Sequence, residues 1–153
     1  MTTPSLRATI RRHEGVRRKA YKDSRGIWTI GCGHNLQCDP ELFPQLRHLI
    51  DVGITDTQID ALLDHDIANA EHQLDLYLPW WRHLDNVRQD VMVNMAFNLG
   101  IQKLLGFHNT LAAIHDGRYA DAAKGMAQSL WDHQVGERAD ELEAMMATGR
   151  LQH

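Results

Sequence analysis

The chain has little cysteine and no long hydrophobic run. Its two cysteines, Cys32 and Cys38, cannot form a disulfide framework in 153 residues, so we expect free thiols. A bridge between them would require Cα atoms within about 7 Å of each other. No N-terminal apolar stretch is long enough for a signal peptide or a membrane span. We therefore expect no membrane insertion, and a protein that accumulates in the cytoplasm that makes it.

The chain also has no excess of positive charge. The formal net charge is −4 with histidine neutral, which argues against a nucleic-acid partner. One local basic cluster is either a solvated face or a weak attractor of an anionic polymer. Its members are Arg7, Arg11, Arg12, Arg17, Arg18 and Lys19. Internal repeats and Gly/Ser-rich linkers are absent, so we expect a single domain and a monomer.

Ten histidines raise the question of a metal site. The strongest candidates stand in Asp64-His65-Asp66 and Glu71-His72, on one predicted helix. However, no HExxH motif or Cys/His cluster is present, and residues i and i+2 do not share a helical face. We interpret these side chains as solvated, and we expect neither a metal nor a cofactor.

Most of the chain has the periodicity of α-helices. Residues 55–58 form a capping box, and the helix that follows should reach about Leu78, where a proline stops it. A second helix has apolar residues all along one side and should be largely buried until Gly100 ends it. Its main row is Val87, Val91, Met95 and Leu99. Shorter helices are expected at residues 104–115, 120–131 and 137–148, with a loop or short helix at 40–44.

The N-terminal segment predicts a short helix with a carboxylate at its end. Thr3 can cap this helix, and Leu6, Ile10 and Glu14 then recur every four residues. Glu14 should therefore point toward the core side, and Gly15 should end the helix. Apolar neighbours and the negative end of the helix dipole favour a protonated Glu14, the state in which a general acid starts. Nearby arginines act in the opposite direction.

A second carboxylate, Asp23, lies in a turn whose Gly26 supplies positive φ. A solvated aspartate there stays ionised, as a base or an electrostatic stabiliser must. Residues 27–30 have the composition of a strand that carries Thr29 back from the turn, where its hydroxyl could orient a water. Two carboxylates in such different settings can hold different protonation states, as glycosidic-bond cleavage requires. On spacing alone the pair is a weak signal, because acidic residues this far apart occur in most proteins.

These residues stand in two longer motifs, Glu-Gly-x5-Tyr-Lys-Asp and Trp-Thr-Ile-Gly-x-Gly-His. With them the chain resembles the phage-type lysozymes of glycoside hydrolase family 24. Further family landmarks follow in the same order at residues 94–100, 106–111 and 131–139, so the resemblance covers nearly the whole chain.

The resemblance implies a lysozyme-like α+β fold that is mostly helical. A small lobe with β-hairpins would span about residues 15–58, and a larger helical lobe would combine 1–14 with about 79–153. A long helix at 59–78 would join the two lobes, and a glycan strand of peptidoglycan would bind between them. The resemblance also implies a structural ion pair between His34 and Asp66.

The implied activity is that of an endolysin. It would hydrolyse the β-1,4 bond between N-acetylmuramic acid and N-acetylglucosamine with inversion, and so lyse a host cell after release to the periplasm and cell wall. By resemblance Glu14 is the general acid, Asp23 the second carboxylate, Thr29 the residue that positions water and Arg138 a cation near Glu14. The implied substrate contacts are Gly31, His34, Asn98, Phe107, Gln134 and Arg138.

Two other functions remain open at this point. A lytic transglycosylase would use one catalytic acid and would need neither Asp23 nor Thr29. A non-catalytic peptidoglycan-binding module would need a degenerate site, whereas every key residue of the motif is present here.

Overall fold

The computed structural model describes residues 2–129 and 136–152. Contacts between Cα atoms divide the chain into two compact units. Residues 7–68 form one, which we call the sheet unit, and residues 1–6 with 69–153 form the other, which we call the helical unit. The described residues are mostly helical with one small antiparallel sheet, as the α+β prediction expected.

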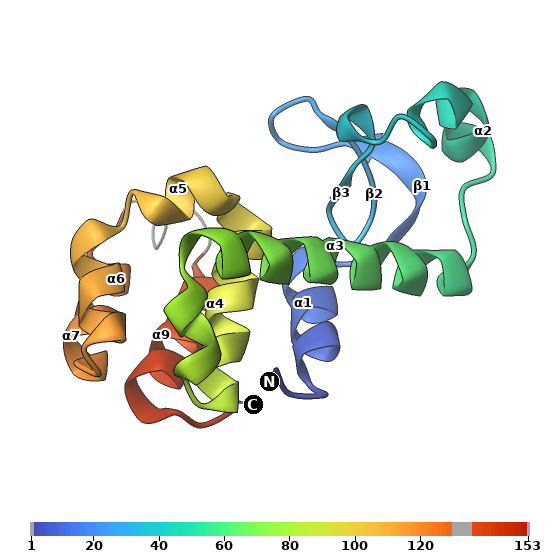
Figure 1. The fold of residues 1–153 in the computed structure, drawn as a ribbon. Helices are drawn as coiled ribbons and strands as arrows, with labels where there is room; N and C mark the ends of the chain where they lie inside the picture. Colours follow the sequence, from blue (N-terminus) through green and yellow to red (C-terminus); the bar gives the residue numbers. More distant parts are fainter. Residues whose placement is uncertain (1, 130–135, 153) are drawn as a thin grey trace. The chain divides into compact units, whose positions relative to one another are not determined.

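The sheet unit contains short elements followed by the start of a long helix (Figure 1). In chain order they are α1 (Leu6–Glu14), β1 (Arg17–Lys22), β2 (Trp28–Gly31), β3 (His34–Asn35), the 3-10 turns η1 (Leu36–Cys38) and η2 (Phe43–Gln45), α2 (Leu46–Asp51) and α3 (Asp56–Tyr77). Helix α3 begins in this unit and ends in the other. Helix α2 is an addition to the predicted elements, because its six residues are too few to give a clear period.

The sheet has the order β1-β2-β3 with both pairs antiparallel. Thr29 in the central strand lies opposite Tyr21 on one side and Asn35 on the other. Thr29 and Ile30 are both buried, so the central strand contributes directly to the core of this unit. Its apolar core consists of Ile10, Ile30, Cys32, Leu36, Leu49, Ile54, Ile59 and Leu63.

The predicted ends of two helices in this unit are confirmed. Gly15 follows α1 with a φ of 73°, and its N–H donates to the carbonyl of Arg11 at 2.9 Å. At the start of α3 the Thr55 hydroxyl accepts from the Gln58 N–H at 3.2 Å. The Gln58 side chain accepts from the Thr55 N–H at 2.8 Å. This reciprocal pair is the predicted capping box.

The predicted cap of α1 is wrong. The helix begins at Leu6, two residues later than a Thr3 cap would place it. Thr3 instead donates to Asp90 from its N–H at 2.8 Å and from its hydroxyl. Asp90 is almost fully buried in the helical unit, so a buried acceptor there competes successfully for the capping side chain.

The helical unit contains the end of α3 and the remaining helices. They are the 3-10 turn η3 (Pro79–His83), α4 (Asn86–Leu99), α5 (Ile101–Leu105), α6 (His108–His115), α7 (Tyr119–Ala127) and α9 (Glu137–Thr148). Helix α4 is buried at every position from Gln89 to Ala96, and Gly100 ends it with a φ of 83°, both as expected. The single helix predicted for 104–115 is instead two, because the chain turns at Gly106 and Phe107.

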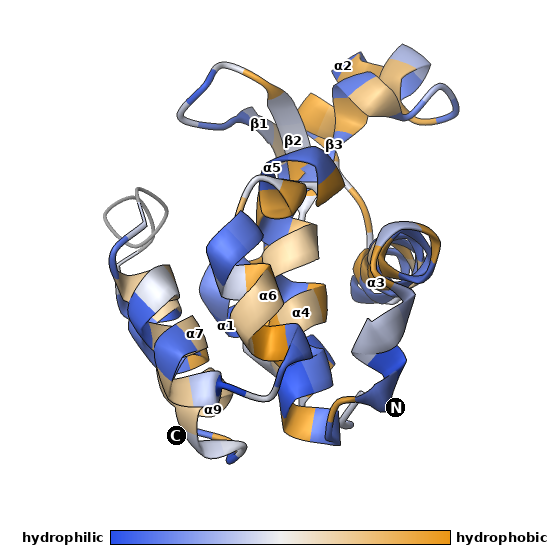
Figure 2. Cartoon of the chain, turned by 60° about the vertical axis from the view of Figure 1, so that its left-hand side comes forward, coloured by the Kyte–Doolittle hydropathy of each residue, from blue (hydrophilic) through white to orange (hydrophobic). Residues whose placement is uncertain are grey.

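The apolar residues of this unit gather between its helices. Figure 2 shows α6 with a hydrophobic middle and hydrophilic ends, which matches the burial of Leu111, Ala113 and Ile114. Other fully buried side chains are Leu74, Trp81, Val91, Met92, Met95, Leu104, Ala122, Met126, Leu142 and Met146. Within the described residues, no helix combines the length and apolar character needed to cross a membrane.

Candidate active site

Glu14 is the last residue of α1, and its half-buried side chain reaches the turn between β2 and β3. A Cβ atom on Gly33 would lie 2.9 Å from the Glu14 Oε2 atom, so the carboxyl group packs against the bare backbone of this glycine. Gly33 also has a φ of 77°, a backbone conformation that residues with a side chain rarely adopt. The Gly33 position therefore creates the space that Glu14 occupies.

The helix that carries Glu14 is tied to α3 by ion pairs. The Arg11 guanidinium lies 2.7 Å from an Asp60 carboxylate oxygen. Arg7, one helical turn before Arg11, forms an ion pair with Asp64, one turn after Asp60. Arg18, on β1, pairs with Asp56 at 2.7 Å. Exposed pairs of this kind contribute at most about 1 kcal/mol each. The first two pairs join α1 to α3 and the third joins β1 to α3, and Arg7, Arg11 and Arg18 all belong to the predicted basic cluster.

Asp23 lies in the turn between β1 and β2 and has a different environment. Its Oδ1 atom accepts the N–H groups of Arg25 and Ile27 at 2.8 and 3.0 Å, as an Asx turn does. Its Oδ2 atom faces the Arg25 guanidinium, with Nη2 at 3.1 Å. The Ile27 N–H, and then the main-chain and side-chain bonds and charge of Arg25, hold the pKa of Asp23 below its usual value, while partial burial opposes them. Asp23 is therefore ionised, as the sequence predicts.

Thr29 is linked to this turn through one peptide group. Its buried hydroxyl donates to the carbonyl of Ile27 at 2.8 Å, and the N–H of the same Ile27 donates to Asp23. Because the hydroxyl hydrogen is used in this bond, the oxygen is left as an acceptor. Thr29 can therefore receive a hydrogen from a water molecule but cannot also donate one to it.

The phenol of Tyr21 is affected by the charges of both carboxylates. It lies opposite Thr29 in the sheet, and burial is the main cause that raises the pKa of its phenol. The negative charges of Glu14 and Asp23 raise that pKa further, whereas Arg17 over the ring lowers it. Glu14 and Asp23 are thus both close enough to one phenol to act on its charge, although they come from a helix end and a hairpin turn.

The predicted pair of His34 and Asp66 is present and has a third member. His34 Nδ1 lies 2.7 Å from Asp66, and Nε2 lies 2.8 Å from Asp39. Burial disfavours the imidazolium, but the bonds and charges of Asp66 and Asp39 outweigh it and raise the pKa of His34. Asp39 is itself held in place, because its other oxygen accepts the N–H groups of Glu41 and Leu42.

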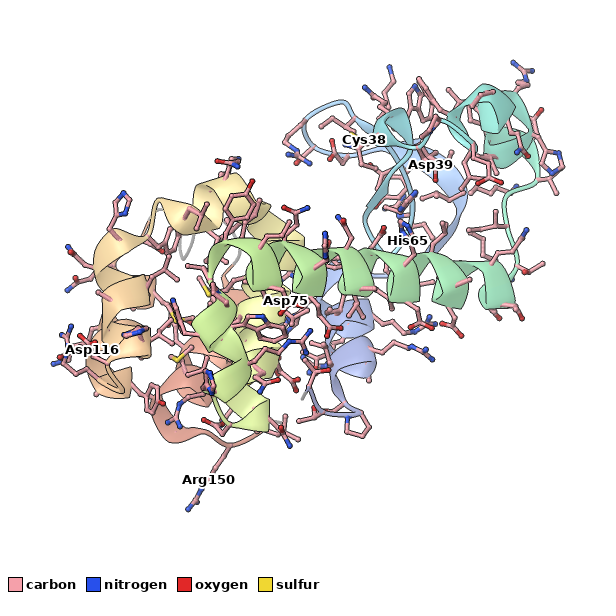
Figure 3. All side chains as sticks on the ribbon, viewed as in Figure 1. Cys38, Asp39, His65, Asp75, Asp116 and Arg150 are labelled. Atoms are coloured by element: carbon pink, nitrogen blue, oxygen red, sulfur yellow. The ribbon has the colours of Figure 1, made fainter. Side chains whose placement is uncertain are left out.

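Sequence reasoning missed Asp39 as a partner of His34. It directly follows the 3-10 turn η1, and its side chain is labelled in Figure 3. The available signal was an aspartate directly before Pro40, which is typical of a turn that begins with a side-chain acceptor. Within residues 2–129 and 136–152, no group of three or more His, Cys, Asp or Glu side chains is arranged to hold a metal ion.

Both cysteines are free thiols, as predicted. Cys38 is exposed, whereas Cys32 is buried between Gly31 and Gly33. Burial raises the pKa of the Cys32 thiol, and the charges of Asp60, Glu14 and Asp66 raise it further against the effect of Arg11. A neutral, buried thiol is inert.

The remaining predicted site residues belong to several places in the chain. Gly31 ends β2 with a φ of 66°, and a Cβ there would make an ordinary contact with Ile59. In the helical unit, Asn98 is half-buried near the end of α4, and Phe107 precedes α6. Gln134, like the Trp131 landmark, lies outside the described residues.

Arg138 is buried near the start of α9. Its Nε and Nη2 atoms donate to the side-chain oxygen of Asn94, in α4, at 3.2 and 2.6 Å. Asn94 was a sequence landmark, but this partner was not foreseen. The pairing of Arg138 with Glu14 stays a prediction from the family resemblance.

Comparison with known proteins identifies a family for most of the chain. The family model for phage lysozyme matches residues 11–146. A probable T4-type lysozyme of Dictyostelium discoideum is 28% identical over 163 aligned positions that cover 96% of both chains. An endolysin of Salmonella phage P22 is 31% identical over 63% of this chain and 62% of its own.

A third relative is much longer than this chain. The pre-baseplate central spike protein of Enterobacteria phage T4 is 29% identical over 97% of the chain, which spans only 28% of the spike protein.

Proposed function

This chain belongs to the phage lysozyme family, and we propose that it is an endolysin that cleaves the glycan strands of peptidoglycan. The bond cleaved is the β-1,4 linkage between N-acetylmuramic acid and N-acetylglucosamine, by acid–base hydrolysis with inversion. The supporting relatives are lysozymes and endolysins by name.

The observation that carries the proposal is the contrast between two carboxyl groups near one tyrosine. Glu14 is half-buried at a helix end against Gly33, whereas Asp23 is kept ionised by two N–H groups and a guanidinium. Glycosidic-bond hydrolysis needs one carboxyl group that gives a proton and one that stays charged. The proposal assigns the first role to Glu14 and the second to Asp23, which belong to the same unit of the fold.

In the proposed reaction, Glu14 donates its proton to the oxygen of the leaving sugar. Water attacks the anomeric carbon as the bond to that oxygen breaks, and Asp23 takes up the proton that the water loses. Thr29 accepts a hydrogen bond from the same water. This bond orients a lone pair of the water oxygen toward the anomeric carbon of the sugar. Inversion requires room for this water, so the two carboxyl groups should stand roughly 6.5–9.5 Å apart.

The remaining assignments concern binding. We assign substrate contacts to Gly31, His34, Asn98, Phe107, Gln134 and Arg138. The ion pairs of His34 with Asp66 and Asp39 hold the loop beyond β3, whereas Gly31, at the end of β2, is buried. Arg138, already oriented by Asn94, is assigned to the carboxyl group of Glu14.

The endolysin relatives support the biological setting that we propose. The enzyme is made in the host cytoplasm, is released to the cell wall and lyses the cell, and it acts as a monomer on peptidoglycan without a cofactor or a nucleic-acid partner.

Mass spectrometry of a purified-wall digest tests this function. Hydrolysis adds the elements of water and gives muramic acid with a reducing end. A lytic transglycosylase would instead leave anhydro-muramic ends, and this result would exclude the proposed reaction. Asp23→Asn and Thr29→Ala are expected to reduce the yield of reducing ends, whereas a transglycosylase would tolerate both changes.

A further inference from the structure

Arg25 makes two kinds of contact with Asp23 in the turn between β1 and β2. Its main-chain N–H donates to Oδ1 at 2.8 Å. Its side chain turns back over the same residue, so that Nη2 and Nε lie 3.1 and 3.4 Å from Oδ2. About two thirds of the Arg25 side chain is nevertheless exposed to solvent.

The two carboxylate oxygens of Asp23 have different partners: main-chain N–H groups bind Oδ1, and the Arg25 side chain binds Oδ2. Oδ1 is occupied by the N–H groups of Arg25 and Ile27, which exist whatever side chain stands at position 25. Oδ2 receives only the guanidinium among the contacts of this turn. A carboxylate offers about four lone-pair sites, so Oδ2 keeps capacity for a water molecule. The Arg25 side chain therefore acts on the oxygen that remains available for chemistry.

We propose that Arg25 is a positioning residue for catalysis, whose guanidinium fixes the plane of the Asp23 carboxylate, presents Oδ2 to the attacking water and adds a positive charge beside that oxygen. This inference rests on the proposed function, because it needs Asp23 to be the group that meets the water. An arginine fork restrains a carboxylate in both position and plane, which a single point charge does not.

The other groups around Asp23 do not provide the same effect. Tyr21, near the end of β1, interacts with Asp23 by charge, but a phenol is neutral throughout the acid range, and burial raises the pKa of Tyr21 further. Arg17 lies over the Tyr21 ring, and Lys22 lies over the ring of Trp28. Among the described contacts, Arg25 is the cation whose side chain bonds Asp23 directly.

The direct test is a carbon-13 NMR titration of the Asp23 carboxyl group in the whole protein. Arg25→Gln keeps a polar side chain of moderate length and removes the charge. We expect the titration midpoint of Asp23 to move to higher pH in this variant, with Arg25→Lys in between. Arg47→Gln is the control, because Arg47 forms an ion pair with Asp51 on α2 at the same distance of 3.1 Å, although that pair is more exposed. This control should leave Asp23 unchanged, and an unchanged midpoint in Arg25→Gln would overturn the inference.

The second readout is the pH profile of kcat/KM on purified walls at low ionic strength. The acid limb of the Arg25→Gln profile should move to higher pH. The kcat/KM of this variant should therefore fall more in acid than near neutral pH. High salt should reduce the difference from wild type, since exposed charges are screened. A shifted NMR midpoint with an unmoved acid limb would overturn the catalytic part of the inference. Failure of the proposed function is detected separately, because the NMR midpoint does not depend on turnover.

Discussion

Gly33 and the carboxyl group of Glu14 share a space that leaves no room for a side chain, since a Cβ on Gly33 would meet Oε2 at 2.9 Å. We predict that Gly33→Ala displaces Glu14 and lowers kcat/KM. Misplacing a catalytic group by about 1 Å costs on the order of 10²-fold in rate. The positive φ adds roughly 1–2 kcal/mol of backbone strain. The measurements are kcat/KM and the free energy of unfolding.

Gly117→Ala is the matched control for this variant. Gly117, between α6 and α7, has a φ of 78°, but nothing lies within 4 Å of the position of its Cβ. It should lose similar stability and keep far more activity than Gly33→Ala. Equal losses of activity in the two variants would mean that strain, not contact with Glu14, explains the effect.

The ion pairs of His34 predict a pH-dependent stability. Because the pKa of His34 is raised in the folded protein, its stabilisation is fully present below the unfolded value of about 6.5 and is lost as pH rises through the folded pKa. Between these two values the loss is about 1.4 kcal/mol per pH unit. Urea unfolding from pH 5 to 9 should show this decline, and His34→Gln should flatten it. The exposed His48 provides a control, since His48→Gln should keep the wild-type slope.

Asp90 predicts the same direction of pH dependence in a more acidic range. Burial raises the pKa of this carboxyl group, against the effect of its bonds from Thr3. Its stabilisation is therefore present below the unfolded value of about 3.9 and is lost as pH rises through the folded pKa. Asp90→Asn removes the buried charge but keeps an acceptor for the Thr3 N–H. It should match wild type in acid and exceed its unfolding free energy at neutral pH.

Thr3→Val completes this test. It removes the hydroxyl donor while leaving the buried carboxylate, so we expect it to cost roughly 1–3 kcal/mol at pH 7. The cost should largely disappear in the Asp90→Asn background. A Thr3→Val variant as stable as wild type at pH 7 would show that this buried contact contributes nothing.

Local patterns predicted the ends of elements well where one residue decides them. The Thr55–Gln58 capping box, Gly15 after α1, Gly100 after α4 and Gly149 after α9 all appear as expected. Each depends on a bond or a φ value that is settled within one turn of chain. The Asp23 turn belongs to the same class, which is why its ionised state could be anticipated.

Contacts between distant segments were not predictable in this way. Asp90 draws Thr3 away from α1, Asp39 joins His34, and Asn94 orients Arg138. Each pairs residues whose proximity depends on the fold, so periodicity gives no signal for it. The packing of Glu14 on Gly33 is similar, since the sequence suggested only that the glycine left backbone open. Helix α2 and the turn at Gly106 were missed because short elements have too little periodicity.

The account depends on Glu14 as the proton donor, and its replacement by glutamine tests this most directly. Glu14→Gln keeps the size of the side chain but cannot give up a proton in the same way, and a positioned general acid typically contributes 10²–10⁴-fold. The measurement is the rate of release of reducing ends from purified walls, with circular dichroism to establish the fold. The account predicts a folded protein whose turnover is reduced by at least about 10²-fold. A folded Glu14→Gln variant that releases reducing ends at a rate near that of wild type would contradict it.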